Sequence, residues 1–257
     1  MVNFILKGLQ APVTRYHEAG IKRCDDWAGQ LAAELKPETL LDLGCGDGSR
    51  LFRYFNKPPK EFYGVEGAPE LKAKAEVRGI IVSSYDLNGR WPYPDNKFDV
   101  VFSNQVIEHL HNCRLFATEA FRVLKPGGTA IIATENLCSL LNWLALTLGY
   151  TPFSLMQTCG RYLGNPLGLH YMKPHVENSV PMDHPAFSGI GGHVRVLTVR
   201  QAKELFELVG FEVEARSISI LPLPDGLSRM LEGVITNRGH FLTLRARKPL
   251  NPVIKNT

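Results

Sequence analysis

Cysteine is scarce in this chain, and neither sign of charge dominates. The 257 residues include five cysteines, none of them in a C-x-x-C pair, and 29 Lys and Arg against 25 Asp and Glu. A disulfide framework or a cysteine-based zinc module is therefore not expected, and a reducing cytoplasm is the favoured compartment. A net charge of +4 without a basic cluster argues against a nucleic acid substrate.

Long apolar runs are missing as well. The longest candidate, residues 140–148, is broken by Asn142 and falls short of the roughly 18 apolar residues that a spanning helix needs. The first twenty residues lack the longer apolar run and the small-residue cleavage site of a secretory signal. We expect a soluble, cytoplasmic protein with no membrane-spanning segment. Transient contact with a membrane surface and homo-oligomerisation are left open.

The chain does contain a regular alternation of short apolar runs and helix-like stretches, which predicts an α/β protein. Such alternation favours right-handed crossovers and a doubly wound, mostly parallel sheet with helices on both faces. The predicted strands are 39–45, 61–67, 80–86, 98–104, 129–135, 211–220 and 240–249, and the predicted helices are 68–79, 106–124 and 198–211. The linker between the last two strands reads as a loop.

A single domain over 1–257 is predicted from this pattern. An N-terminal helical segment (11–36) precedes a core (37–135), and a helix and strands (197–257) close the chain. The intervening residues 136–196 are rich in Gly, Pro and His. About sixty irregular residues inside a compact domain are either functional or mobile, because ordinary loops have roughly 2–6 residues.

Three interpretations of the apolar part of 136–196 compete. It is a lid over the pocket, a contact for another subunit, or an interfacial helix that approaches a lipid-linked acceptor. Basic residues, which a membrane-surface helix would need, are absent between Leu137 and Gln157. The lid, which would carry the substrate preference, is therefore favoured.

The most informative segment is LLDLGCGDGSR at 40–50. Gly44, Gly46 and Gly48 form G-x-G-x-G after an apolar strand and before a helix, where the backbone can turn tightly and approach a ligand. Asp42, two residues before the first glycine, would repel a diphosphate but suit an amino group or another cation. The sixth position counted from the first glycine is serine, which departs from the dinucleotide fingerprint, and no nucleoside triphosphate motif occurs.

Two further acids follow the next predicted strands. Glu66 ends the second strand, at the usual place of a carboxylate that binds ribose hydroxyls, and Asp86 ends the third. Together with Asp42 they would gather at the carboxyl edge of the sheet, beside the switch point where ligands bind.

These features resemble the class I S-adenosylmethionine-dependent methyltransferases, particularly their small-molecule (type 11-like) branch. The resemblance covers about 37–136 and 193–248. It is carried by DLGCGDG (42–48), Glu66, YDLNGRWPYPDNKFDVVFSNQVIEHL (85–110) and RVLKPGG (122–128). It implies a Rossmann-like sheet of seven strands with an antiparallel last strand, S-adenosylmethionine as cofactor, and methyl transfer to a small molecule or to a sugar-like group on a glycan or lipid. Oxygen is slightly favoured as the acceptor atom.

The resemblance also implies roles for nine residues around the cofactor. Gly44, Cys45 and Gly46 would line its methionine and ribose portions. Asp42 would lie near its ammonium group, Glu66 would hold its ribose hydroxyls, Asp86 would accept a hydrogen bond from the adenine amino group, Leu87 would flank the adenine, and Asn104 with Gln105 would border the sulfonium.

Two histidines are candidate general bases, which the reaction needs only if the acceptor must lose a proton. His109 is expected at the start of the helix after the fourth strand, and His193 lies where the insertion rejoins the core; each also has a purely structural interpretation. No metal site is expected, because His170, His175 and His184 are irregularly spaced and have no neighbouring Cys ligands.

Two rival functions are considered. An NAD-dependent oxidoreductase would share the sheet and Glu66 but needs G-x-G-x-x-G and a proton donor that we do not find. A non-catalytic binding module would keep the fold and use the insertion to hold a partner. The residues at 103–106, SNQV, lack the prolines of the turn found in methyltransferases that act on nucleic acid bases.

Overall fold

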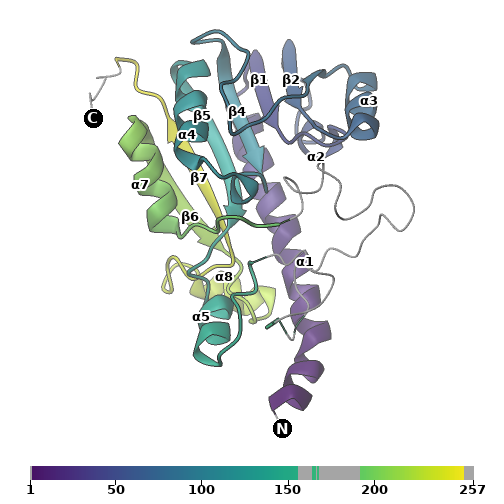
Figure 1. Cartoon of the computed structure of the whole chain (residues 1–257), viewed down its shortest axis with the longest axis vertical. Coiled ribbons are helices and arrows are strands. Elements are labelled where there is room, and N and C mark those ends of the chain that lie inside the picture. Colours follow the sequence, from purple (N-terminus) through teal and green to yellow (C-terminus); the bar gives the residue numbers. More distant parts are fainter. Residues whose placement is uncertain (1, 156–163, 166, 168–191, 252–257) are drawn as a thin grey trace. The chain divides into compact units, whose positions relative to one another are not determined.

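The computed structural model describes residues 2–155, 164–165, 167 and 192–251 (Figure 1). Most of the predicted lid therefore lies outside the described residues, and so do His170, His175 and His184. Among the residues that are described, no helix is both long and apolar enough to cross a bilayer.

Seven strands form one sheet in the order β3-β2-β1-β4-β5-β7-β6. They are β1 (Thr39–Leu43), β2 (Glu61–Val65), β3 (Ile81–Ser83), β4 (Phe98–Asn104), β5 (Leu124–Glu135), β6 (Glu212–Ile218) and β7 (Phe241–Arg247). β1 pairs in parallel with β2 and β4, β2 with β3, and β4 with β5. The order reverses between β1 and β4, as in a doubly wound sheet. The predicted fold class is confirmed.

The antiparallel direction of β7 follows from the hydrogen bonds at its two ends. The Gly127 N–H, near the start of β5, donates to the Lys248 carbonyl just after β7. The Asn136 N–H, just after β5, donates to the His240 carbonyl just before β7. The two strands therefore run in opposite directions, and the predicted antiparallel last strand is confirmed.

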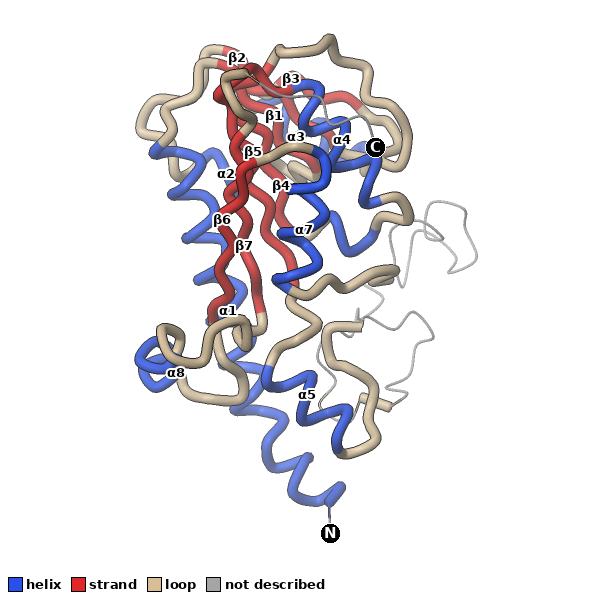
Figure 2. The backbone as a smooth tube through the Cα atoms, turned by 90° about the vertical axis from the view of Figure 1, so that its left-hand side faces the viewer, coloured by secondary structure: helices blue, strands red, loops and turns tan. Residues whose placement is uncertain are grey.

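The helices are α1 (Val2–Glu34), α2 (Ser49–Phe52), α3 (Pro69–Val77), α4 (Cys113–Val123), α5 (Leu140–Thr147), α7 (Val199–Val209) and α8 (Asp225–Leu231), with a 3-10 helix η1 (Ile107–His109). Figure 2 shows α2 and the second half of α1 on one side of the sheet and α4 and α7 on the other. Each side of the sheet is thus covered, which matches the burial of β1, β4 and β5 on both faces.

Several boundaries differ from the sequence-based prediction. The segment 106–124 is not one helix, because η1 ends at His109 and α4 begins only at Cys113, where Asn112 accepts a hydrogen bond from the Leu115 N–H. The first helix starts at Val2 instead of residue 11 and contains Pro12 in its interior, a residue that is more common at helix starts.

The loop predicted between the last two strands contains α8. Pro224 immediately precedes this helix, so the proline that indicated a loop in fact stands at a helix start. The Ser228 side chain accepts from the Ile220 N–H and donates to the Glu232 carboxylate, which fixes the helix against the preceding segment. Proline and glycine are ambiguous signals here, because they mark both loops and helix ends.

The chain divides into two compact units. Unit 1 comprises Met1–Arg23, Glu135–Val199 and Ser217–Leu242, and unit 2 comprises Cys24–Thr134, Arg200–Arg216 and Thr243–Thr257. The domain boundaries predicted at 37, 136 and 197, and the lid, stay predictions. Seven of the nine predicted cofactor residues lie in the segments that follow β1, β2, β3 and β4. Asp42 and Asn104 lie within β1 and β4, and all nine belong to unit 2.

Candidate cofactor site

The glycine turn directly follows β1 and is tied to the end of β2. Gly44, Gly46 and Gly48 all have positive φ, at 74°, 57° and 78°, which side chains rarely permit. The N–H groups of Gly44 and Cys45 both donate to the Val65 carbonyl, at 2.9 and 3.0 Å. The turn is therefore fixed by main-chain bonds, and its sequence is dictated by its backbone conformation.

Two glycines of the turn have different surroundings. A Cβ on Gly44 would lie 2.6 Å from Cγ2 of Val106, so a larger residue does not fit there. A Cβ on Gly46 would meet no atom of the described residues within 4 Å. The main chain at Gly46 therefore has open space beside it, into which a ligand can come close.

Glu66 directly follows β2, and both of its carboxylate oxygens accept hydrogen bonds from main-chain N–H groups. Oε2 accepts from the Gly46 N–H at 3.0 Å, and Oε1 accepts from the Ala68 N–H at 2.8 Å. Each carboxylate oxygen has a second lone pair and can accept a further hydrogen bond. Glu66 is thus held in one orientation and keeps the capacity to bind hydroxyl donors.

Asp42 lies within β1 and is only 4% exposed. Burial raises the pKa of this carboxyl to about 8; the positive charge of Arg50 opposes the effect and the negative charge of Glu66 adds to it. Burial also raises the pKa of the neighbouring Cys45 thiol, with Asp42 and Glu66 adding to it, so Cys45 stays protonated. A cation placed next to Asp42 would favour its ionised form.

Asp86 and Leu87 lie in a turn beyond the third strand. β3 ends at Ser83, so the prediction that Asp86 ends this strand was wrong by three residues. The Asp86 carboxylate accepts from the main-chain N–H and the side-chain amide of Asn88. The Asn88 side-chain oxygen accepts in turn from the N–H groups of His111 and Asn112, which holds the Asp86–Leu87 turn against the start of α4.

Asn104 and Gln105 stand where β4 ends. Leu43 pairs with Ser103, which puts Asn104 level with Gly44 at the first residue of the glycine turn. Gln105 has a positive φ of 57°, and its N–H donates to the Ala133 carbonyl at 2.9 Å. A non-glycine residue in this conformation is strained, and such strain concentrates at functional sites.

Asp25 joins this site from α1, although nothing in the sequence marked it. Its Oδ1 accepts from the Asn104 Nδ2 at 2.6 Å, and its Oδ2 lies 3.6 Å from the Arg50 Nε. Asp25 is 8% exposed, and it shares the run CDDW with Asp26. Helical spacing alone does not say which of two adjacent acids faces the sheet. Asn88 was missed as well; the D-x-N spacing typical of an Asx turn was its only signal.

His109 does not begin the helix after β4, because it lies in η1. Its N–H donates to the Val106 carbonyl at 2.9 Å. The neighbouring Glu108 is fully buried and accepts from the Thr134 hydroxyl at 2.7 Å. Among these two residues the histidine is the more exposed, and its catalytic role stays a prediction.

His193 belongs to unit 1, where it is grouped with Glu135 and Ser154. Its Nδ1 lies 2.5 Å from the Ser154 carbonyl oxygen and 3.7 Å from Glu135 Oε2. Burial raises the pKa of Glu135 to about 8, and the charge of His193 and a hydrogen bond with Ser154 oppose this effect. Because a carbonyl only accepts, Nδ1 carries the hydrogen and Nε2 is the proton-accepting atom of the neutral ring.

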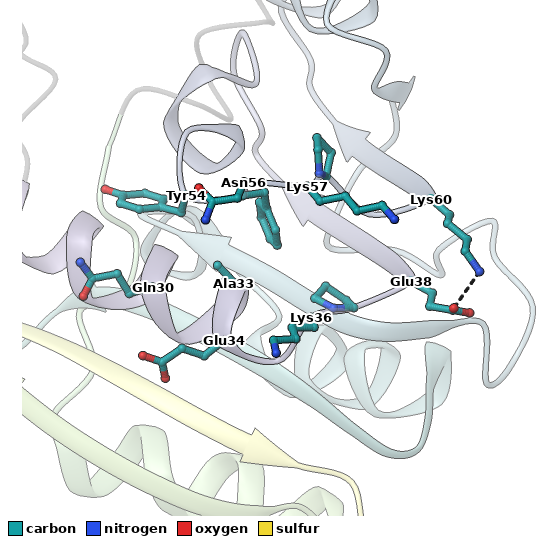
Figure 3. Close-up of a pocket in the computed structure, with 12 residues that line it drawn as sticks. Gln30, Ala33, Glu34, Lys36, Glu38, Tyr54, Asn56, Lys57 and Lys60 are labelled. Carbon is teal, nitrogen blue, oxygen red and sulfur yellow. Dashed lines mark hydrogen bonds and ion pairs between the residues drawn. The ribbon is translucent and has the colours of Figure 1, made fainter.

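A cavity of about 580 Å³ lies at the opposite end of β1 (Figure 3). It is lined by the last turn of α1, the connection to β1 and the segment after α2: Gln30, Ala33, Glu34, Lys36, Pro37, Glu38, Tyr54, Phe55, Asn56, Lys57, Pro58 and Lys60. Glu38 and Lys60 form an exposed ion pair at 2.7 Å. No predicted site residue lines this cavity, so it is separate from the cofactor site.

Known proteins similar to this chain point to one family. A family model described as a methyltransferase domain matches residues 16–216. A protein of Mycolicibacterium smegmatis named "Probable S-adenosylmethionine-dependent methyltransferase" is 51% identical over 108 residues, which cover 42% of each chain. The 27-O-demethylrifamycin SV methyltransferase of Amycolatopsis mediterranei is 33% identical over 118 residues, 43% of each chain. These matches span less than half the length of the curated relatives.

The solved structures agree with this assignment at the level of the fold. An S-adenosylmethionine-dependent methyltransferase from Mesorhizobium loti superposes with a TM-score of 0.53 at 18% identity, over 81% of this chain and 90% of that one. The family model covers most of the chain and includes the glycine turn, Glu66 and Asn104. The chain therefore belongs to the methyltransferase-domain family, whose members use S-adenosylmethionine as cofactor.

Proposed function

We propose that the chain binds S-adenosylmethionine at the glycine turn and transfers its methyl group to a small-molecule or sugar-like acceptor, with oxygen as the favoured acceptor atom. The observation that carries the proposal is the Glu66 carboxylate, which two main-chain N–H groups hold beside the open face of Gly46. A rigid acceptor pair next to bare main chain suits a ribose with two adjacent hydroxyls.

The remaining residues fit the other parts of the cofactor. Asp42 is a buried carboxyl whose ionised form a neighbouring ammonium would stabilise. The Oδ1 of Asn104 is buried and has no hydrogen-bond partner within the described part of the chain, so this acceptor is available to a ligand. Asp86 is exposed in a turn anchored by Asn88 and can accept from the adenine amino group.

When bound, the cofactor supplies a methyl group on a positively charged sulfur, which a nucleophile can displace. The acceptor oxygen forms the new bond to carbon as the carbon–sulfur bond breaks, and an acceptor hydroxyl loses its proton. The protein mainly has to align the acceptor and exclude water, and such alignment is worth effective molarities on the order of 10⁵ M or more. It also has to receive the proton, for which His109 and His193 are the candidates.

His193 is the stronger candidate base. Its hydrogen bond to the Ser154 carbonyl fixes the tautomer, and the Glu135 carboxyl 3.7 Å away would stabilise the imidazolium ion once it is ionised. His193→Gln should lower kcat by about 10²–10⁴-fold and leave cofactor affinity unchanged. His109→Gln is measured beside it, because it tests the other predicted base. Unchanged kcat in His193→Gln would remove His193 from the reaction.

The proposed acceptor class is supported by the name of one relative and by the charge of the chain. The Amycolatopsis relative is named 27-O-demethylrifamycin SV methyltransferase, a name that refers to an O-demethylated compound. A net charge of +4 without a basic cluster does not favour a nucleic acid as the substrate. Oxygen on a small molecule is therefore our favoured acceptor, and mass spectrometry of a methylated product identifies the atom.

Calorimetry tests the cofactor part of the proposal. S-adenosylhomocysteine should bind, whereas NAD should not, and the reverse result would favour the rival oxidoreductase. Glu66→Ala should weaken binding by about 1–3 kcal/mol, roughly 5- to 150-fold. The exposed Glu70→Ala, four residues further along the chain, is the matched control and should bind as the wild type does.

Labelled methyl transfer then separates an enzyme from a binding module. The purified chain is incubated with methyl-labelled S-adenosylmethionine and extracts of small metabolites and glycolipids. Label in a metabolite supports the enzyme. Tight cofactor binding without label in any extract would contradict methyl transfer and leave the non-catalytic module.

A further inference from the structure

The amide of Asn104 has only one possible orientation. Its Nδ2 donates to Asp25 Oδ1 at 2.6 Å, and an ionised carboxylate can only accept. The amide therefore turns its NH₂ to Asp25 and its oxygen away from it. That oxygen is buried and lacks a partner among the described residues. A buried acceptor without a donor is costly in the free protein, which points to a ligand that supplies positive charge or a donor.

Asp25 brings a negative charge to this position from outside the glycine turn. Its side chain is 10% exposed, and the single basic group within 4 Å of it in the described structure is Arg50, at 3.6 Å. The Arg50 side chain is 53% exposed, so solvent screens its charge more than that of Asp25. The positive charge of Arg50 also acts on Asp42, where it opposes the rise in pKa that burial causes.

We propose that Asp25 is a positioning residue that makes the site distinguish the charged cofactor from its uncharged product. It orients the Asn104 oxygen toward the ligand and holds a buried negative charge behind it, so that the positively charged sulfur of S-adenosylmethionine binds better than the neutral sulfur of S-adenosylhomocysteine. The inference rests on the proposed function of the same site, and it adds a property: relief of product inhibition.

The two ligands isolate this effect, because they differ only in the methyl group and the charge that it carries. Contacts to the ammonium, carboxylate, ribose and adenine are common to both and cancel in the ratio of their dissociation constants. A unit charge about 12 Å away changes an affinity about tenfold at an effective dielectric constant of about 20. Loss of the charge on Asp25 should therefore change the ratio even without direct contact.

The test compares Asp25→Asn with Asp26→Asn by calorimetry, using both ligands. Asn at position 25 can still accept from Asn104, so the substitution removes the charge and keeps the hydrogen bond. Asp26 is the adjacent acid on α1, but its side chain is 35% exposed and accepts from the Tyr54 hydroxyl. We expect Asp25→Asn to lower the preference for S-adenosylmethionine about tenfold and Asp26→Asn to change it less than twofold.

A second variant keeps the test decisive if Asp25→Asn does not fold. Arg50→Gln removes the exposed charge that offsets Asp25, so it should raise the preference about threefold. The inference is overturned if Asp25→Asn leaves the ratio of the two dissociation constants unchanged. If Asp25→Asn does not fold, an unchanged ratio in Arg50→Gln overturns it. An equal effect of Asp26→Asn also overturns it. If the wild type binds neither ligand, the proposed function itself fails, which is a different result from binding with an unchanged ratio.

Discussion

Replacing Asp42 by Asn should stabilise the free protein, and more so as the pH rises. Burial raises the pKa of Asp42 from 3.8 to about 8, with Arg50 opposing and Glu66 adding to the shift. In the unfolded chain the carboxyl ionises near its ordinary pKa, so folding holds a proton on Asp42 across the interval between the two values. Below about pH 4 the Asp42 carboxyl is neutral in both states and does not lower the free energy of unfolding. As the pH rises toward 8, it lowers the free energy of unfolding progressively.

The magnitude follows from the size of the shift. Each pKa unit corresponds to about 1.4 kcal/mol, so a shift of about four units costs the folded state up to about 6 kcal/mol above pH 8. At pH 5 only about 2 kcal/mol of this cost applies, because pH 5 lies only about one unit above the unfolded-state pKa of 3.8. Asn is neutral at every pH and avoids the cost. The gain from Asp42→Asn should thus be about 4 kcal/mol larger at pH 8.5 than at pH 5.

Urea unfolding without cofactor, at pH 5 and pH 8.5, measures this difference. Asp47→Asn is the matched control in the same turn, because hydrogen bonds from Ser49 lower the pKa of Asp47. That variant should be no more stable than the wild type at either pH. If Asp42→Asn does not raise the free energy of unfolding, or raises it equally at the two pH values, ionisation of the buried Asp42 does not destabilise the fold. Calorimetry should find the same variant weaker in cofactor binding.

Four further substitutions test other parts of the molecule. Glu135→Gln should stabilise the protein increasingly as the pH rises, by up to about 5 kcal/mol, because burial raises the pKa of Glu135 from 4.5 to about 8. A difference in urea unfolding that does not depend on pH would contradict this. Gly44→Ala should lower the free energy of unfolding by about 2 kcal/mol or more, because φ is 74° and its Cβ would lie 2.6 Å from Val106. Gly46→Ala, whose added Cβ meets no described residue within 4 Å, should cost about 1 kcal/mol in stability and weaken cofactor binding instead; equal losses of stability in the two glycine variants would be the contrary result. Lys248→Met should lower stability by about 1–3 kcal/mol without affecting cofactor affinity, because the buried ammonium donates three hydrogen bonds near the end of α4; an unchanged melting temperature would refute it.

The sequence was sufficient for the strands that build the site. β1 and β4 are short apolar runs buried on both faces, and such runs are characteristic of a parallel sheet covered by helices. The glycine turn was equally readable, because three positive φ angles in five residues demand glycine. Local backbone requirements leave a direct mark on the sequence, which is why this part of the site was predictable.

Contacts between segments that are distant in the sequence could not be predicted from it. Asp25 and Asn104 are 79 positions apart, and neither has a neighbouring residue that indicates the other. The same holds for η1, since the break between His109 and Cys113 depends on the Asn112 cap and on the anchoring of this segment by Asn88. A helical pattern over 106–124 contains no information about those tertiary hydrogen bonds, so the prediction extended one helix through the break.

The buried acids of unit 2 connect stability with function. Asp25 and Asp42 both lie under 10% exposed at the carboxyl edge of the sheet, and Arg50, which is half exposed, offsets the charge of each only in part. Buried carboxylates without full compensation destabilise a fold, and apolar residues at the same positions would be more stable. Such a cost is understandable where a ligand brings positive charge. S-adenosylmethionine carries two such charges, on its ammonium group and on its sulfur, so one ligand can compensate both acids. The burial of these two carboxyl groups, which lowers the stability of the free protein, is thus the property that would let it bind this cofactor selectively.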